Sequence, residues 1–130
     1  MAFTDETTIR THTGWDNTDL VPPGLVAQRI GDAHEALLEA LDPDYAASED
    51  DLLKLAETEL STAFLLRSLA TESGFEDRDI RTGNLTLRAG GRAKTLSDMA
   101  DLEEQRAWSH ARSFLKVGSR RTPLKLVTAD

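Results

Sequence analysis

The chain has 130 residues, a length typical of one domain, and 39% of them are apolar. It contains no cysteine, which excludes a disulfide scaffold, a thiolate metal site and a cysteine nucleophile. No apolar run reaches the roughly eighteen residues that a membrane-spanning helix needs, and the first residues lack the basic and apolar regions of a secretory signal. These features predict a protein that works inside a cell or a particle, with no membrane partner.

Charge is distributed unevenly along the chain. The net charge is −8, but residues 1–79 contain 18 acids and 5 bases, whereas residues 80–130 contain 5 acids and 10 bases. Oppositely charged surfaces could bring two copies together head to tail, or both halves could fold together and simply solvate one surface. Arginine outnumbers lysine 11 to 4. An acidic, lysine-poor surface is typical of proteins from a salt-loaded cytoplasm, which predicts a halophilic source.

The first part of the chain predicts two helices. Thr4, followed by two acids, predicts the N-cap of a short helix over about residues 5–13, which Gly14 ends. A second helix is expected over about residues 22–41, because proline is tolerated at a helix start and apolar residues then recur at helical spacing. Its apolar face is Val26, Ile30, Ala33, Leu37 and Leu41.

A third, long helix is expected from a cap at Ser48 to about Ser73, with Gly74 as its stop. We expect its first half to be one-sided, through Leu52, Leu55 and Ala56. Its second half is apolar nearly all round, which predicts either the central helix of a bundle or an extra face that meets a neighbouring subunit. Two apolar residues, Phe64 and Leu65, are therefore candidates for a subunit interface.

The next segment has a different pattern. Around the glycine turns Gly83-Asn84 and Gly90-Gly91, apolar and polar residues alternate, which predicts a β-hairpin or extended arm at about residues 79–96. An isolated hairpin is marginal in water, so this arm must lie on the bundle or on another molecule. Four bases and no acids lie within residues 80–94, and we take them as subunit-interface candidates: Arg81, Arg88, Arg92 and Lys94.

A last long helix is expected from a cap at Ser97 to about Val117, before Gly118. Its predicted inward face is Ala100, Ala107, Ala111 and Phe114, flanked by Trp108 and Leu115. The fold class is thus mainly α, a small bundle of three longer helices plus a short N-terminal helix. We expect residues 1–118 to form one domain that includes the arm, and residues 119–130 to form an extended docking tail. The tail's candidate docking residues are Arg120, Arg121, Leu124, Leu126 and Val127.

No residue pattern predicts catalysis. The histidines His12, His34 and His110 lie on three different predicted helices without a metal-binding spacing, so no metal and no cofactor are expected. Glycine-rich and serine motifs of phosphate-binding loops and hydrolases are also missing. The acids of the third helix are interpreted as a solvated face: Asp50, Asp51, Glu57 and Glu59. Enzyme function is therefore not expected, and the low isoelectric point argues against a duplex-DNA binder.

Taken in order, these pieces resemble the head–tail connector (adaptor) proteins of tailed double-stranded-DNA viruses. The resemblance covers about residues 5–117 and lies in the order of the pieces: a short helix ending near a Gly-Trp turn, an Ile/Ala-faced helix at 26–33, the Leu-Leu-Lys-Leu-Ala stretch at 52–56, Glu72-Ser-Gly with Gly-Asn-Leu-Thr-Leu at 83–87, and a final helix. The acidic, lysine-poor surface and the glycine-rich stretch at 82–91 depart from the family and suggest a virus of halophilic archaea.

The resemblance implies a structural role in the virion neck, after assembly in the host cytoplasm. It implies a ring of roughly a dozen copies, a closed arrangement of head-to-tail contacts. The implied partners are the portal protein and a stopper or tail-completion protein, with DNA passing through the channel without sequence-specific binding. The tail could dock by adding a strand to a partner. The alternative is a small acidic helical module that binds or regulates another protein.

Overall fold

The structure, a computed structural model, describes residues 2–71, 80–82, 85–87 and 92–116. Its elements in chain order are α1 (Glu6–Thr13), α2 (Pro23–Ala40), the 3-10 turn η1 (Pro43–Tyr45), α3 (Asp51–Thr71), β1 (Ile80–Thr82), β2 (Leu85–Leu87), α4 (Arg92–Ala111) and the 3-10 turn η3 (Arg112–Phe114). The predicted fold class is confirmed, because the described residues form a mainly helical bundle of three longer helices and a short N-terminal one, with one hairpin.

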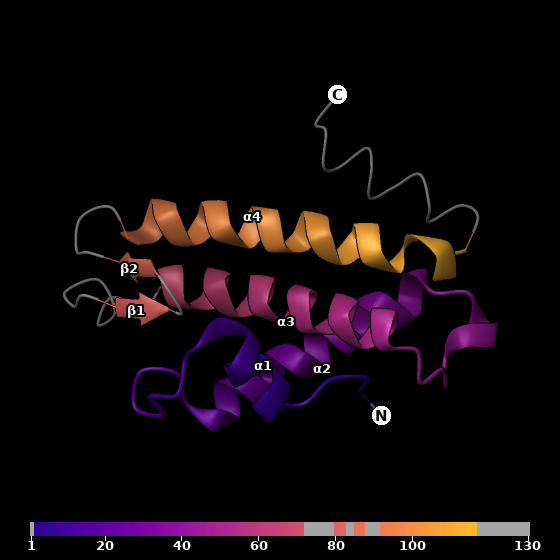
Figure 1. Cartoon of the computed structure of the whole chain (residues 1–130), viewed down its shortest axis with the longest axis horizontal. Coiled ribbons are helices and arrows are strands. Elements are labelled where there is room, and N and C mark those ends of the chain that lie inside the picture. The colour runs from indigo at the N-terminus through magenta and orange to yellow at the C-terminus, as the bar shows by residue number, and fades with distance from the viewer. Residues whose placement is uncertain (1, 72–79, 83–84, 88–91, 117–130) are drawn as a thin grey trace.

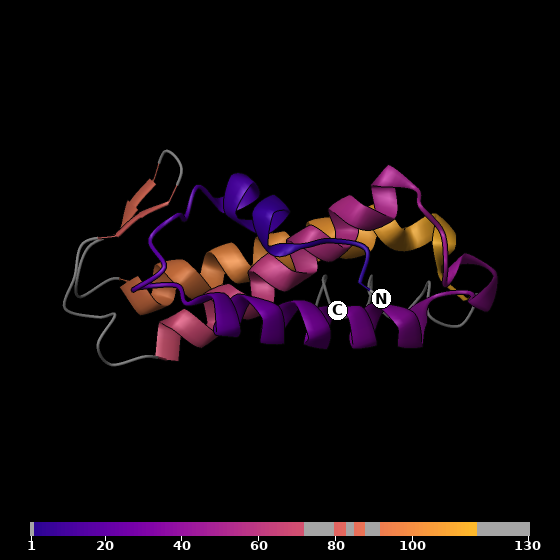
Figure 2. The same cartoon turned by 90° about the horizontal axis from the view of Figure 1, so that it is seen from below.

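Helix α3 is the centre of the bundle. It packs against α4 on one side, with the two helices antiparallel, while α1 and α2 cover its other side (Figure 1, Figure 2). Every residue from Ala56 to Ala63 is buried, including the polar ones. A helix that is covered all round lies in the interior of a bundle, so the prediction of a central helix is confirmed.

The apolar core consists of two clusters placed along α3. The first cluster joins α1, the start of α2, the end of α3 and the start of α4 through Ile9, Trp15, Val21, Val26, Ile30, Ala63, Leu65, Leu66, Leu69, Leu96 and Ala100. The second joins the end of α2, the start of α3 and the end of α4 through Ala33, Leu37, Leu41, Leu53, Ala56, Leu60, Ala107, Ala111 and Leu115. Each fully buried leucine contributes about 1.5–3 kcal/mol to folding.

The first turns of α3 face differently from the prediction. Leu53, Ala56 and Leu60 point into the core, at helical spacing. Leu52 and Leu55 remain 38% and 37% exposed, so the expected inward role of these two leucines is wrong. Leu53 and Ala56 let α2 and α4 pack closely against one face of α3. The face that carries Leu52 and Leu55 therefore stays outside the core.

The helix caps also differ in detail. Asp5, not Thr4, caps α1, and its carboxylate accepts a 2.8 Å hydrogen bond from the backbone N–H three residues on. Gly14 ends α1 with a left-handed φ of 77°, as predicted. Before α3, the carboxylate of Asp50 accepts a 2.8 Å bond from the second residue after it. Ser48, the predicted cap, accepts instead from the Asp50 N–H at 3.1 Å.

Helix α4 begins at Arg92, earlier than the predicted cap at Ser97. Leu96 accounts for the difference, because it is fully buried in the first cluster and extends the apolar face of the helix toward its start. The predicted arm at 79–96 is therefore too long, since residues 92–96 are helical. The described hairpin consists of β1 and β2 only.

Strands β1 and β2 pair antiparallel, with Ile80 opposite Leu87 and Thr82 opposite Leu85. This register agrees with a turn at Gly83-Asn84, which itself lies outside the described residues, as does Gly90-Gly91. Figure 2 shows the hairpin standing away from the helices at one end of the bundle.

The last helix ends earlier than predicted, at Ala111, and continues as η3 rather than as helix to about residue 117. After η3, Leu115 pairs with Leu41 in an isolated antiparallel bridge. The Lys116 N–H also donates to the Ala40 carbonyl at 3.0 Å. These backbone bonds join the ends of α2 and α4, and the predicted tail at 119–130 lies outside the described residues.

Candidate functional site

Two buried glutamates lie in the middle of α3, among the residues that α3 gives to the second apolar cluster. Glu57 is 0% exposed and Glu59 is 3% exposed, so the prediction of a solvated face is wrong for both. It agrees with the structure for Asp50 and Asp51, which are exposed. A buried carboxylate is costly without hydrogen-bond partners. Each of these two glutamates has a histidine as a partner, on a different neighbouring helix.

Glu57 ties the N-terminal segment and α2 to α3. Its Oε1 accepts hydrogen bonds from the backbone N–H groups of Phe3, at 2.7 Å, and Thr4, at 3.0 Å. Its Oε2 lies 2.7 Å from Nδ1 of His34 on α2. The Thr4 hydroxyl lies 2.7 Å from that of Thr58. Three partners replace the water that this carboxylate loses, so Glu57 joins three segments of the chain.

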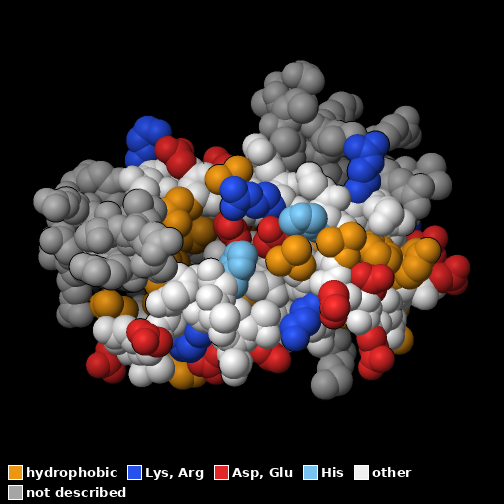
Figure 3. Space-filling model, viewed as in Figure 1, with side chains coloured by type: hydrophobic (Ala, Val, Ile, Leu, Met, Phe, Trp, Pro, Cys, Tyr) orange, Lys and Arg blue, Asp and Glu red, His pale blue; other side chains and the backbone are white. Residues whose placement is uncertain are grey.

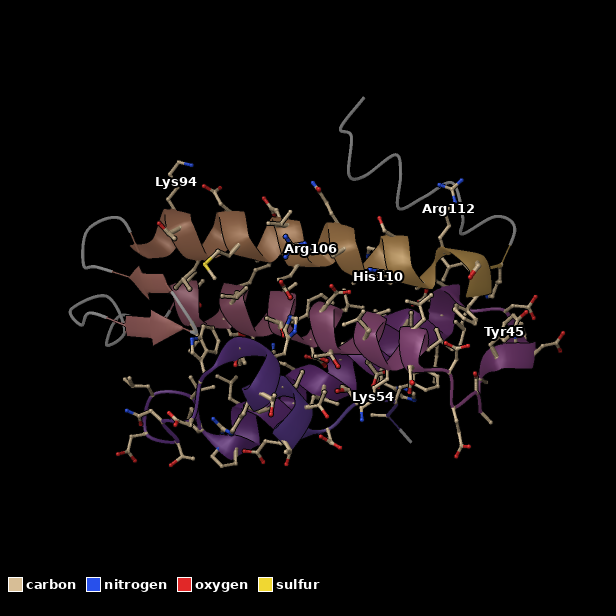
Figure 4. The ribbon with its side chains drawn as sticks, in the orientation of Figure 1. Tyr45, Lys54, Lys94, Arg106, His110 and Arg112 are labelled. Carbon is tan, nitrogen blue, oxygen red and sulfur yellow. The ribbon has the colours of Figure 1, made fainter. Side chains whose placement is uncertain are left out.

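The second glutamate belongs to a histidine–glutamate cluster, which we define as His12, Glu59, Glu103, Arg106 and His110. It joins α1, α3 and α4. Glu59 Oε1 lies 2.6 Å from His110 Nδ1. Glu103 Oε1 lies 2.7 Å from His12 Nε2, and its Oε2 lies 3.5 Å from the Arg106 guanidinium. Figure 3 shows histidine, acidic and basic side chains gathered at the middle of this face, and Figure 4 places Arg106 and His110 along α4 over α3.

The cluster shifts two pKa values upward. The hydrogen bond from His12 to Glu103 raises the pKa of His12, while burial raises the pKa of Glu59. The contribution of His12 to stability is therefore fully present below its ordinary pKa of about 6.5 and is lost as the pH rises through the raised value. The raised pKa of Glu59 also makes stability fall as the pH rises, starting above the ordinary glutamate pKa of about 4.3. The reason is that ionising a buried carboxyl costs folding free energy. Both effects stabilise the folded chain at acidic pH.

The chemistry that this cluster supports is proton binding. Within the described ranges, no group of three or more histidine or acidic side chains is arranged to hold a metal ion. His110 is more accessible than its partner, with 38% of its side chain exposed against 5% for Glu59. The cluster thus presents the His110 ring at the surface while the Glu59 carboxylate stays inside.

The predicted interface residues fall in different places. Lys94 lies on α4 with 82% of its side chain exposed and forms an ion pair of 2.9 Å with Asp98. Phe64 is partly buried against the second cluster. Leu65 is 1% exposed inside the first cluster, so it does not present itself to a neighbouring subunit and its predicted interface role is corrected.

Two of the other predicted interface residues belong to described elements. Arg81 belongs to β1 and Arg92 is the first residue of α4. Those that lie outside the described residues are Arg88, Arg120, Arg121, Leu124, Leu126 and Val127.

A surface hollow of about 540 Å³ lies at the corner between α2 and α3, beside the N-terminal segment. Its acidic lining comes from Glu49, Asp50 and Asp51, with Lys54 as the lining base. The remaining lining residues are Ala2, Phe3, Ala46, Ala47 and Ser48. The hollow was not predicted from the sequence, because it forms where the turn after α2 folds against the N-terminal segment.

No protein-family model, curated protein or solved structure matches this chain. None of the described helices combines the length and the apolar content that crossing a bilayer requires.

Proposed function

We propose that this chain is a structural virion protein, a head–tail connector (adaptor) of a tailed double-stranded-DNA virus. Copies of the chain form a ring of about a dozen between the portal and the tail or stopper protein, closed by head-to-tail contacts. DNA leaves through the channel without sequence-specific binding. The virion neck is the final location of the protein, and its acidic, lysine-poor composition suits a halophilic host.

The observation that carries this proposal is the hairpin at one end of an elongated bundle. Strands β1 and β2 pair with one another and stand clear of the helices in Figure 2. A two-stranded hairpin has little stability of its own in water. A neighbouring copy in a ring, or the portal, supplies the surface that such an arm needs.

The net charge of −8 is compatible with a channel that DNA passes without binding. Affinity for duplex DNA comes largely from lysine and arginine contacts to phosphates. An acidic wall repels phosphates, so it would favour passage over retention.

Molar mass in solution tests the proposal. Light scattering on the purified chain, alone and with the portal protein of the same virus, would be run at low salt and in molar KCl. We expect a mass near a dozen protomers, or a complex that forms only with the portal. A chain that stays monomeric in both salts and ignores the portal would overturn the connector role.

A second candidate is an acidic module that binds another protein, and the hollow at the α2–α3 corner favours it. The three lining acids and the Phe3 ring suit a basic peptide with an apolar residue. A monomer that binds such a peptide, but neither itself nor the portal, would support this alternative over the connector.

A further inference from the structure

The C-terminal end of α1 is attached to α4 through His12. The His12 Nε2 lies 2.7 Å from Oε1 of Glu103, whose side chain is 14% exposed. Figure 3 shows two histidine side chains beside acidic ones at the middle of this face. The segment before α1 is held in another way, because its backbone and Thr4 are hydrogen-bonded to Glu57 and Thr58 of α3. Helix α1 is therefore held at both ends, and a histidine holds the second one.

Three charged side chains from α3 and α4 act on the His12 ring. Glu103 accepts its hydrogen bond, Glu59 of α3 adds a second negative charge, and Arg106 of α4 opposes both. Glu59 also lies 2.6 Å from His110 and is repelled by the charge of Glu103. The two carboxylates outnumber the one guanidinium, so a proton on His12 balances the negative charge that these helices bury together.

The end of α1 and the loop after it form one unit. Arg10 donates hydrogen bonds to the backbone carbonyls of Trp15, at 3.0 Å, and Val21, at 2.8 Å. Both loop residues belong to the first apolar cluster, as does Ile9, the buried residue of α1. When the end of α1 moves, the loop at residues 14–22 should therefore move with it.

Two features weaken this unit relative to the rest of the bundle. Helix α1 has eight residues, too few for a helix that is stable alone in water. The Trp15 Nε1 is buried and has no hydrogen-bond partner among the described residues, which destabilises the closed conformation. The other helices share the second cluster, and Arg67 of α3 pairs with Asp101 and Glu104 of α4 at 3.0 and 2.7 Å. Opening of α1 would therefore leave α2, α3 and α4 packed.

We propose that His12 and Glu103 form a pH-dependent latch, which keeps the end of α1 and the loop at 14–22 closed while His12 holds a proton and releases them when the proton leaves. Release uncovers the part of the first cluster that Ile9, Trp15 and Val21 cover. Apolar surface thus becomes accessible at alkaline pH and is covered at acidic pH. The latch works within one copy of the chain, so its test is independent of the proposed ring.

The direction of the latch follows from the two states of His12. A protonated ring donates a charge-assisted hydrogen bond to Glu103, which is about twice as strong as a neutral one. That bond raises the pKa of His12 in the closed conformation, whereas the released ring has the ordinary pKa of about 6.5. The closed conformation therefore binds the proton more tightly. Opening should become more frequent as the pH rises from about 6.5 through the raised value.

Native-state hydrogen exchange, between about pH 6 and pH 8.5, measures this opening. The Gly14 N–H donates to the Arg10 carbonyl at 2.8 Å, and the Val21 N–H donates to the Asn17 carbonyl at 3.0 Å, so these amides report on the end of α1 and on the loop. Their protection, corrected for the intrinsic exchange rate, should fall by up to about 10-fold per pH unit above pH 6.5, the limit for one released proton.

Urea separates local opening from global unfolding, because its effect scales with the surface that becomes exposed. Gly14 and Val21 should be less protected than Leu60, in the middle of α3, and low urea concentrations should change their exchange less than that of Leu60. If all three amides have the same protection and the same dependence on urea, the opening is global and the latch is refuted.

Three variants assign the proton. His12→Gln has no proton to lose, so the pH dependence at Gly14 and Val21 should disappear. Glu103→Gln removes the acceptor and should weaken the same dependence. His34→Gln is the matched control, because His34 has a glutamate partner at the same 2.7 Å but lies on α2; it should keep the dependence. Circular dichroism checks that each variant keeps its helices. Exchange that is independent of pH in the wild type, or a dependence that survives in His12→Gln, would overturn the proposal.

Discussion

Truncating Glu57 should separate the N-terminal segment from the bundle. Its carboxylate is fully buried and accepts bonds from two backbone N–H groups, while its other oxygen pairs with His34. Glu57→Ala leaves these partners without an acceptor and creates a cavity, and removing one partner of a buried pair costs about 3–5 kcal/mol. A domain of this size has about 5–15 kcal/mol in total. At about 4 °C per kcal/mol, the Tm should fall by roughly 12–20 °C.

The assay is urea denaturation followed by circular dichroism, together with hydrogen exchange at the amides of Phe3 and Thr4. Exchange at both amides should accelerate in Glu57→Ala. Glu57→Gln keeps an acceptor for the two amides, so it should lose less than Glu57→Ala. Glu39→Ala, at an exposed site on α2, should change stability by no more than about 0.5 kcal/mol. If Glu57→Ala and Glu39→Ala lose equal stability, the anchoring role of Glu57 is refuted.

Three further predictions concern smaller groups. The free energy of unfolding should fall as the pH rises above about 6.5, because His12, whose pKa the hydrogen bond to Glu103 raises, then loses its stabilising proton. His12→Gln should flatten this slope, and an unchanged slope would contradict the assignment. Ser61→Ala should raise stability by about 1 kcal/mol in urea denaturation, because the buried Ser61 Oγ has no hydrogen-bond partner in the described structure. A loss of stability in this variant would show that the hydroxyl is hydrogen-bonded. Gly14→Ala should cost about 1–2 kcal/mol, because φ at Gly14 is 77°; a neutral result in thermal unfolding would argue against the left-handed cap.

The order and type of the helices follow from local patterns. The four-residue and three-residue spacings of α2, the proline at its start and the left-handed glycine after α1 are signals carried by neighbouring residues. The position of α3 at the centre also follows from its apolar second half. The error at the start of α4 has a local cause as well, because Leu96 continues the apolar face ahead of Ser97.

The histidine–glutamate pairs were not predicted, although one signal was present. Glu57 lies four residues after Leu53 and three before Leu60, so it occupies an inward position of the helical pattern. An acid at such a position requires partners, and His34 lies on the inward side of the neighbouring helix α2. Glu59 has no comparable signal, because its burial depends on how closely α1 and α4 approach α3.

By itself the sequence determined the helices, the hairpin and the asymmetric charge, because each depends on residues a few positions apart or on simple counts. Tertiary structure decided which face of α3 is covered, since the packing of α2 and α4 buries Leu53 and leaves Leu52 and Leu55 outside. It also decided which charges are solvated. A carboxylate remains buried only where histidine or backbone donors from other segments converge on it, and that convergence exists only once the helices have assembled.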